Sequence, residues 1–116
     1  MKRKTIRNHR DFLTAPNDLS GRADFFLVKA KCAKIPNDAR YGIVSSKKAL
    51  RFAVQRNRAK RMLRDWIAFN EDLMSPDLDY IFIVRPNILA AKRDDGRYQM
   101  KHVLKKISDS YKNNDK

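Results

Sequence analysis

The chain has 116 residues, 42% of them hydrophobic, and carries a formal net charge of +14 at pH 7. This length and composition predict one folded domain around a single core and exclude a chain that is disordered throughout. The longest uninterrupted apolar run is Tyr80–Val84, far short of the roughly 20 residues in a membrane-spanning helix, and no apolar signal core follows the basic N-terminus, so we expect neither a membrane protein nor a secreted one.

Positive charge is concentrated in the first part of the chain. Residues 1–64 contain 18 Lys or Arg and 4 acidic residues, whereas residues 65–116 contain 9 of each. This asymmetry predicts binding to a polyanion, either nucleic acid or an anionic membrane surface.

The N-terminal segment is basic and has few apolar side chains. Residues 1–10 include five Lys or Arg and, beyond Met1, one apolar residue. This composition predicts a flexible basic arm that settles on a partner. We expect one folded domain over residues 11–112 and a frayed tail over residues 113–116.

Several short elements are expected in the first half of the domain. Residues 11–15 predict a short helix, and residues 17–21 have the composition of a turn. Residues 25–34 alternate between apolar and polar side chains, which predicts a half-buried strand. Residues 41–46 predict a second strand that pairs back on it as a hairpin. The apolar face of the first strand contains Phe26, Val28, Ala30 and Cys32.

Cys32 is the only cysteine in the chain, which excludes a disulfide framework and a cysteine-based metal cluster. We expect it to be a small buried side chain. A lone cysteine is typical of a reducing, cytoplasmic setting.

Two helices and a buried strand are expected in the second half. The run at Tyr80–Val84 predicts a strand buried on both faces. A first helix after Arg51 has an apolar stripe made by Ala59, Met62, Leu63, Trp66, Ile67, Leu73 and Met74. A second helix, after turn and cap residues at 94–96, has a stripe made by Met100, Val103, Leu104, Ile107 and Tyr111.

The most unusual segment is the basic run from Lys47 to Arg64, which has eight Lys or Arg in 18 residues and no acidic residue. Cations in the first turns of a helix oppose the preference set by the helix dipole, so a purely structural helix would avoid them. Guanidinium groups match phosphate oxygens in two-point contacts, and an Asn amide can bond sugar, phosphate or base edges. The alternative is a solvated basic face, but the clustering favours binding to structured RNA.

The sequence has no arrangement typical of protein catalysis. Its acidic residues are scattered, and His9 and His102 have no partner at a spacing suited to a metal site or a general base. Nucleotide-binding loops and nucleophile motifs are missing as well. We therefore expect no catalytic residue and no metal site on the protein.

The basic run carries a resemblance to a known family. Ser46-Lys47-Lys48, followed by A-V-Q-R-N-R-A-K-R-M-L-R at residues 53–64, resembles the S-K-K…A-V-x-R-N-R-x-K-R-x-x-R signature of the bacterial ribonuclease P protein component. The resemblance implies a single α+β domain of order α-β-β-β-α-β-α with a ribosomal protein S5 domain 2-like fold. It also implies that the Arg-rich helix lies in a left-handed crossover between parallel strands, which is rare.

The same resemblance implies a function. The protein would be an accessory subunit of an endoribonuclease in which a large catalytic RNA, with Mg²⁺, removes the 5′ leader of precursor tRNA and frees the mature 5′ end. Catalysis and the Mg²⁺ ions would belong mainly to the RNA. The partners would be the catalytic RNA and precursor tRNA, with no membrane and no small-molecule substrate. The alternative is a ribosomal or nucleoid-type structural protein that binds nucleic acid with the same basic face.

Two groups of site residues follow from the resemblance. A cleft for the single-stranded leader would be lined by Phe12, Phe26 and Val28, although Pro16 stands where the family often has a second aromatic ring. Plain core packing is the alternative for Phe12 and Phe26. The predicted RNA-binding residues, including Arg51 from the same basic run, are Lys47, Lys48, Arg51, Arg56, Asn57, Arg58, Lys60, Arg61 and Arg64.

Overall fold

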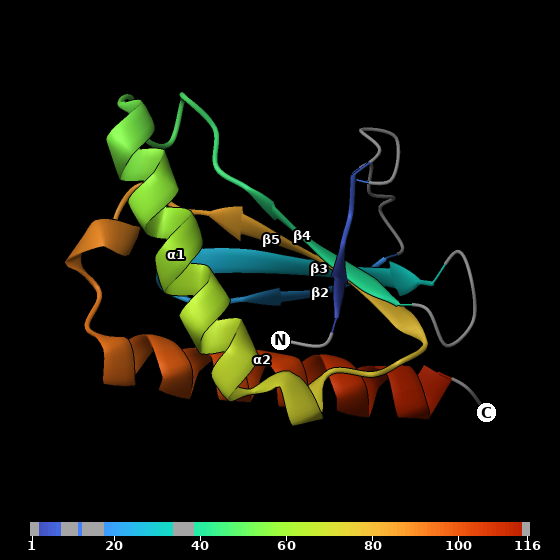
Figure 1. Ribbon diagram of the computed structural model, residues 1–116. Coiled ribbons are helices and arrows are strands. Elements are labelled where there is room, and N and C mark those ends of the chain that lie inside the picture. Colours follow the sequence, from blue (N-terminus) through green and yellow to red (C-terminus); the bar gives the residue numbers. More distant parts are fainter. Residues whose placement is uncertain (1–2, 8–11, 13–17, 34–38, 115–116) are drawn as a thin grey trace.

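The computed structural model describes residues 3–7, 12, 18–33 and 39–114. These residues form a five-stranded mixed sheet covered on one face by two helices (Figure 1). The strand order is β1-β4-β5-β3-β2. The strands are β1 (Lys4–Thr5), β2 (Leu19–Arg22), β3 (Phe26–Cys32), β4 (Arg40–Val44) and β5 (Leu78–Val84).

The helices lie late in the chain, on either side of β5. They are α1 (Ala53–Phe69) and α2 (Arg93–Asn114), and two short 3₁₀ turns, η2 (Glu71–Leu73) and η3 (Ile88–Ala90), flank β5. β4 and β5 are parallel neighbours, and the connection between them through α1 is left-handed, as the resemblance implies (Figure 1). From β2 onward, the order of elements matches the predicted β-β-β-α-β-α.

The core lies between the sheet and the two helices. Phe26 and Val28 on β3 point toward the helices, opposite Val84 and Phe82 of β5. The stripe predicted for α1 is confirmed as far as Ile67, because Ala59, Leu63, Trp66 and Ile67 are buried and Met62 is half-buried. Its last two members, Leu73 and Met74, also pack on the core but lie beyond the end of α1 at Phe69. Burial of each large apolar side chain contributes about 1.5–3 kcal/mol, so this stripe fixes which side of α1 faces solvent.

The predicted helix at the end of the chain is confirmed, but its start differs from the prediction. Residues 94–96 lie in the first turns of α2 and not in a turn before it. Gly96 packs under the ring of Trp66, and a Cβ at this position would lie 2.0 Å from Trp66 Cε2. The glycine therefore allows α1 and α2 to approach closely, which the sequence pattern did not indicate.

Two strand predictions were wrong. The predicted hairpin does not form, because β5 lies between β3 and β4 and pairs with both. Residues 19–21 of the predicted turn belong instead to β2 (Leu19–Arg22), which pairs with β3. Cys32 was expected to be buried and is exposed, because it is the last residue of β3.

Part of the predicted N-terminal arm packs on the domain. Lys4–Thr5 pairs with β4, and Ile6 is buried and donates its N–H to the Tyr41 carbonyl oxygen. The Arg3 guanidinium donates to the carbonyl oxygens of Ser75 and Leu78.

The helix expected over residues 11–15 lies outside the described residues, except for Phe12. Residues 34–38, between β3 and β4, also lie outside them. Among the parts of the chain that are described, no helix has the length and apolarity needed to cross a membrane.

Candidate RNA-binding surface

The outer face of α1 presents four of the nine predicted RNA-binding residues to solvent. Asn57, Arg58, Arg61 and Arg64 are exposed and form what we call the basic face of α1. Their exposure follows from the helical period, because the opposite side of α1 is held in the core. Lys60 lies half-buried at the margin of the apolar stripe, as its position in the period predicts.

The loop before α1 presents three more of the predicted cations. Lys47, Lys48 and Arg51 are exposed there. Ser46 shapes the loop, because its hydroxyl oxygen accepts from the Ala49 N–H at 3.1 Å and its carbonyl oxygen accepts from the Leu50 N–H at 3.0 Å. The lysine pair therefore stands in a hydrogen-bonded turn next to the start of the helix.

Arg56 joins the loop to the helix. Its Nη1 donates to the carbonyl oxygens of Leu50 at 3.1 Å and Arg51 at 2.8 Å. The side chain is half-buried, so Arg56 orients the loop as well as adding charge. This second role depends on the path of the loop and could not be predicted from the sequence.

The cations of this surface have no acidic partner in the described part of the chain. Within the described ranges, no Asp or Glu forms an ion pair with any of the nine predicted RNA-binding residues. Phosphate groups of a partner could therefore approach them without displacing an internal counter-ion.

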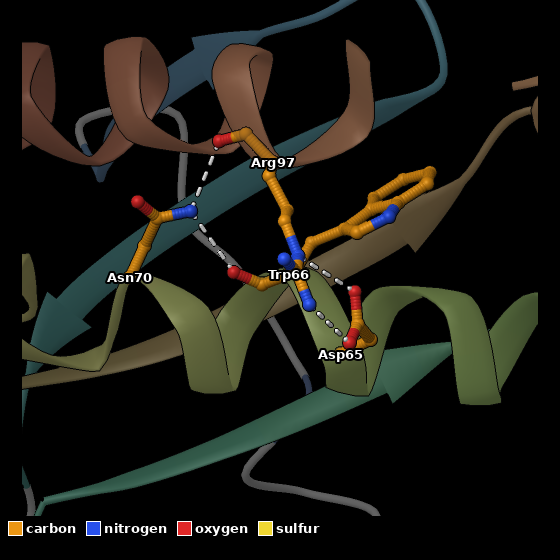
Figure 2. Close-up of polar contacts among 4 residues, drawn as sticks. All are labelled: Asp65, Trp66, Asn70 and Arg97. Atoms are coloured by element: carbon orange, nitrogen blue, oxygen red, sulfur yellow. Dashed lines mark hydrogen bonds and ion pairs between the residues drawn. The ribbon is translucent and has the colours of Figure 1, made fainter. Parts of the chain in front are cut away.

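The one acidic residue on α1, Asp65, is paired with α2 instead (Figure 2). Arg97 Nη2 donates to Asp65 Oδ1 at 3.0 Å, and Arg97 Nε donates to Asp65 Oδ2 at 3.1 Å. The hydrogen bonds from Arg97 lower the pKa of the Asp65 carboxyl below its usual value. Asn70 adds a second tie, because its Nδ2 donates to the carbonyl oxygens of Trp66 and Arg97, both at 3.0 Å.

A hollow of about 220 Å³ lies beside the basic face, at the edge where β4 meets β1. Its lining brings Phe12 together with Lys60 and Arg64 of α1. Phe12 packs against β4 so closely that a Cβ on Gly42 would lie 2.4 Å from Phe12 Cε1. The hollow therefore places an aromatic ring and two cations around one concave surface.

The structure corrects two of the residues predicted for the leader cleft. Phe26 and Val28 are fully buried between the sheet and the helices, so they are core residues and line no surface. For Phe26 the alternative of plain core packing is therefore the one observed. Phe12 is half-buried and lies against Gly42.

The opposite face of the sheet carries different side chains. In the strand register Gly42 is beside Ile81, and Ile81 is beside Lys29, so all three lie on the face turned away from α1 and α2. Leu27 and Lys31 share this face, because they alternate with Phe26 and Val28 along β3. The alternation was visible in the sequence, but the choice of which face the helices cover was not.

The buried carboxylate of the domain has a structural role. Asp79 is 1% exposed, and it accepts from the Arg40 N–H at 2.7 Å and from Arg40 Nη2 at 3.2 Å. The pair holds Arg40 at the start of β4 against Asp79 of the neighbouring strand β5. Over the described residues, no three His, Cys, Asp or Glu side chains gather as metal ligands would.

Comparisons with known proteins agree on one family. The family model described as Ribonuclease P matches residues 1–108. A ribonuclease P protein component of Desulforamulus reducens is 36% identical over 109 residues, which cover 94% of this chain and 96% of the relative.

A ribonuclease P protein component of Marinobacter nauticus is 34% identical over 87 residues, and the match spans 75% of this chain but 64% of the relative. The solved ribonuclease P protein of Thermotoga maritima superposes with a TM-score of 0.73 at 25% identity, covering 90% of this chain and 97% of that one.

Proposed function

This chain belongs to the ribonuclease P protein family, and we propose that, as a protein subunit of ribonuclease P, it binds the catalytic RNA and precursor tRNA through the basic face of α1 and the loop before it. The observation that carries the proposal is the set of exposed cations that pair with no Asp or Glu among the residues that the structure describes. Guanidinium and ammonium groups of this kind bind the phosphates of a nucleic acid, and the counter-ions condensed on that nucleic acid are released into solution, which favours binding.

The role of the protein is electrostatic. The catalytic RNA and precursor tRNA are both polyanions and repel each other. Cations on α1 would neutralise phosphates where the two RNAs meet, which lowers the Mg²⁺ concentration needed for their approach.

Bond cleavage and the Mg²⁺ ions are assigned to the RNA partner. Mg²⁺ prefers oxygen ligands such as carboxylates, but Asp79 and Asp65 are each occupied by an arginine. These two side chains build the fold, and the protein would supply binding and orientation.

We assign the single-stranded 5′ leader to the side of the sheet that carries Phe12. The ring of Phe12 would stack with a base, and Lys60 and Arg64 in the same hollow would hold phosphates. Lys29, on the same side of the sheet as Gly42, extends the cationic path.

We also propose a cytoplasmic location, because the exposed thiol of the only cysteine, Cys32, suits a reducing compartment.

Reconstitution tests this function. The protein is mixed with the ribonuclease P RNA encoded in the same genome, and cleavage of precursor tRNA is measured at low Mg²⁺. We expect cleavage to rise strongly with the protein present and product to carry the mature 5′ end. RNA alone and protein alone are the controls.

Two results would contradict the proposal. If cleavage at low Mg²⁺ does not respond to the protein, a structural role in another nucleic-acid assembly is favoured. If the protein cuts precursor tRNA without any RNA partner, it is a nuclease in its own right.

A further inference from the structure

Asp65 is an anion at the C-terminal end of a cationic surface. It is the only acidic residue between Lys47 and Asn70, and it lies one helical turn after Arg61 and directly after Arg64. Its side chain is 37% exposed. Residues four apart in sequence are neighbours on the same side of a helix. Without another partner, the Asp65 carboxylate would therefore pair with Arg61 and would repel phosphates.

The observed structure prevents this pairing by giving Asp65 another partner. The guanidinium of Arg97 covers both carboxylate oxygens with two hydrogen bonds, at 3.0 and 3.1 Å (Figure 2). Over the described residues, Arg61 forms no ion pair and remains exposed. The two-point contact suits arginine, whose planar fork matches a carboxylate.

Arg97 is itself held in place from two sides. Its guanidinium carbon lies 4.2 Å from the centre of the Phe69 ring, and its carbonyl oxygen accepts from Asn70 Nδ2. Phe69 and Asn70 stand at the end of α1, so α1 itself orients the arginine that masks its carboxylate.

We propose that Arg97 is a positioning residue for RNA binding, because it occupies Asp65 and so leaves Arg61 free to contact phosphate. This inference rests on the proposed function, in which the basic face of α1 binds RNA. Arg97 would touch no RNA itself in this role.

The charge state of Asp65 supports the proposal. Hydrogen bonds from Arg97 lower the pKa of Asp65, and Arg93 adds a smaller effect in the same direction. Even without these cations, an ordinary carboxyl is ionised at neutral pH. Removing the Arg97 guanidinium therefore exposes a full negative charge next to Arg61 and Arg64.

The test compares Arg97→Gln, Asp65→Asn and the double variant in the full-length protein. Lys105→Gln is the matched control, since Lys105 is an exposed cation of α2 and its replacement removes the same charge. Affinity for ribonuclease P RNA is measured at low and at high salt, and thermal melts are recorded for every variant.

We expect Arg97→Gln to weaken RNA binding about three- to tenfold at low salt and less at high salt, as for one unscreened charge near phosphates. Lys105→Gln should change affinity less than about twofold. The double variant should bind within about twofold of the wild type, because it has no anion at position 65. All three variants of the pair should melt below the wild type, because each lacks the salt bridge. Arg97→Gln and the double variant should melt alike, because both also lose the contact between the Arg97 guanidinium and Phe69.

A double variant that binds as weakly as Arg97→Gln would overturn the proposal, since Arg97 would then act only through stability. An Arg97→Gln variant that binds like Lys105→Gln would overturn it as well.

The Arg61→Ala variant separates these results from a failure of the proposed function. If Arg61→Ala binds as tightly as the wild type, α1 is not the RNA surface; if it binds weakly, only the inference about Arg97 fails.

Discussion

At the scale of single residues, exposure separates the side chains of α1 that build the core from those that are free to bind. Arg58 and Arg61 project into solvent, whereas Leu63 and Trp66 are buried. A helical period applied to the sequence predicted this division, because four buried side chains fix the orientation of the whole helix. The partners of Arg56 and Asp65 could not be predicted in this way, since they lie in a loop and on another helix.

Substitution of Arg58 or Arg61 by Ala should therefore affect binding and not folding. We expect the free energy of unfolding of each variant to stay within roughly 0.5 kcal/mol of the wild type, as for most surface changes. Affinity for ribonuclease P RNA should fall about tenfold, the effect of losing one charged hydrogen bond. Circular dichroism melts and filter binding measure the two quantities, and early unfolding of both variants would show that the arginines are structural.

The stability supplied by the Asp65–Arg97 pair should depend on pH. Arg97 lowers the pKa of Asp65 below the ordinary value of 3.8, so the ionised form stabilises the folded state. The stabilisation is complete well above pH 3.8 and is lost as the pH falls through the lower folded pKa. Urea unfolding of wild type and Asp65→Asn should thus differ by a constant amount from neutral pH to about pH 5 and converge in acid. A difference that persists unchanged below the folded pKa would show that the carboxylate charge is not responsible.

At the scale of elements, close packing of the two helices positions the RNA-binding face. Trp66 of α1 lies over Gly96 of α2, and Gly21 of β2 lies so close to α2 that a Cβ there would be 2.6 Å from Val103 Cγ1. The two glycines also explain why the start of α2 and the strand β2 were not predicted. A glycine within α2 looks like a turn signal, and β2 is too short for alternation to be visible.

Substitution of Gly96 by Ala should test this packing. A glycine-to-alanine change in an open helix stabilises by up to about 1 kcal/mol, but here the added methyl group overlaps the Trp66 ring. We expect a loss of about 1–3 kcal/mol, the usual effect of overpacking. Lys101→Ala, at an exposed position of α2, is the control. A Gly96→Ala variant that is as stable as the wild type would mean that the helices are not in close contact here.

The strand order is also set at this scale. Residues 41–46 were predicted to pair with the strand before them, which is the usual arrangement for neighbours in sequence. Instead β5 enters between β3 and β4 after the crossover through α1. Periodicity contains no information on such long-range pairing, and only the family resemblance implied a pair of parallel strands around α1.

At the scale of the whole molecule, the fold places eight of the excess positive charges, those of residues 47–64, on one helix and the loop before it. Residues 1–64 hold the excess, and residues 65–116 are balanced. The fold class and the exposure of the basic face of α1 could be predicted because the basic run is contiguous in sequence. The burial of Phe26 and Val28 could not be predicted, because it depends on which face of the sheet the helices cover.

The salt dependence of binding to ribonuclease P RNA tests the central claim most directly. If the basic face of α1 and its loop contact six to eight phosphates, the logarithm of the affinity should fall with the logarithm of salt concentration with a slope on the order of −4 to −7. Replacing Arg58, Arg61 and Arg64 together should reduce the magnitude of that slope by about 2 to 3. A wild-type slope near −1, or a slope that the triple replacement leaves unchanged, would contradict the account.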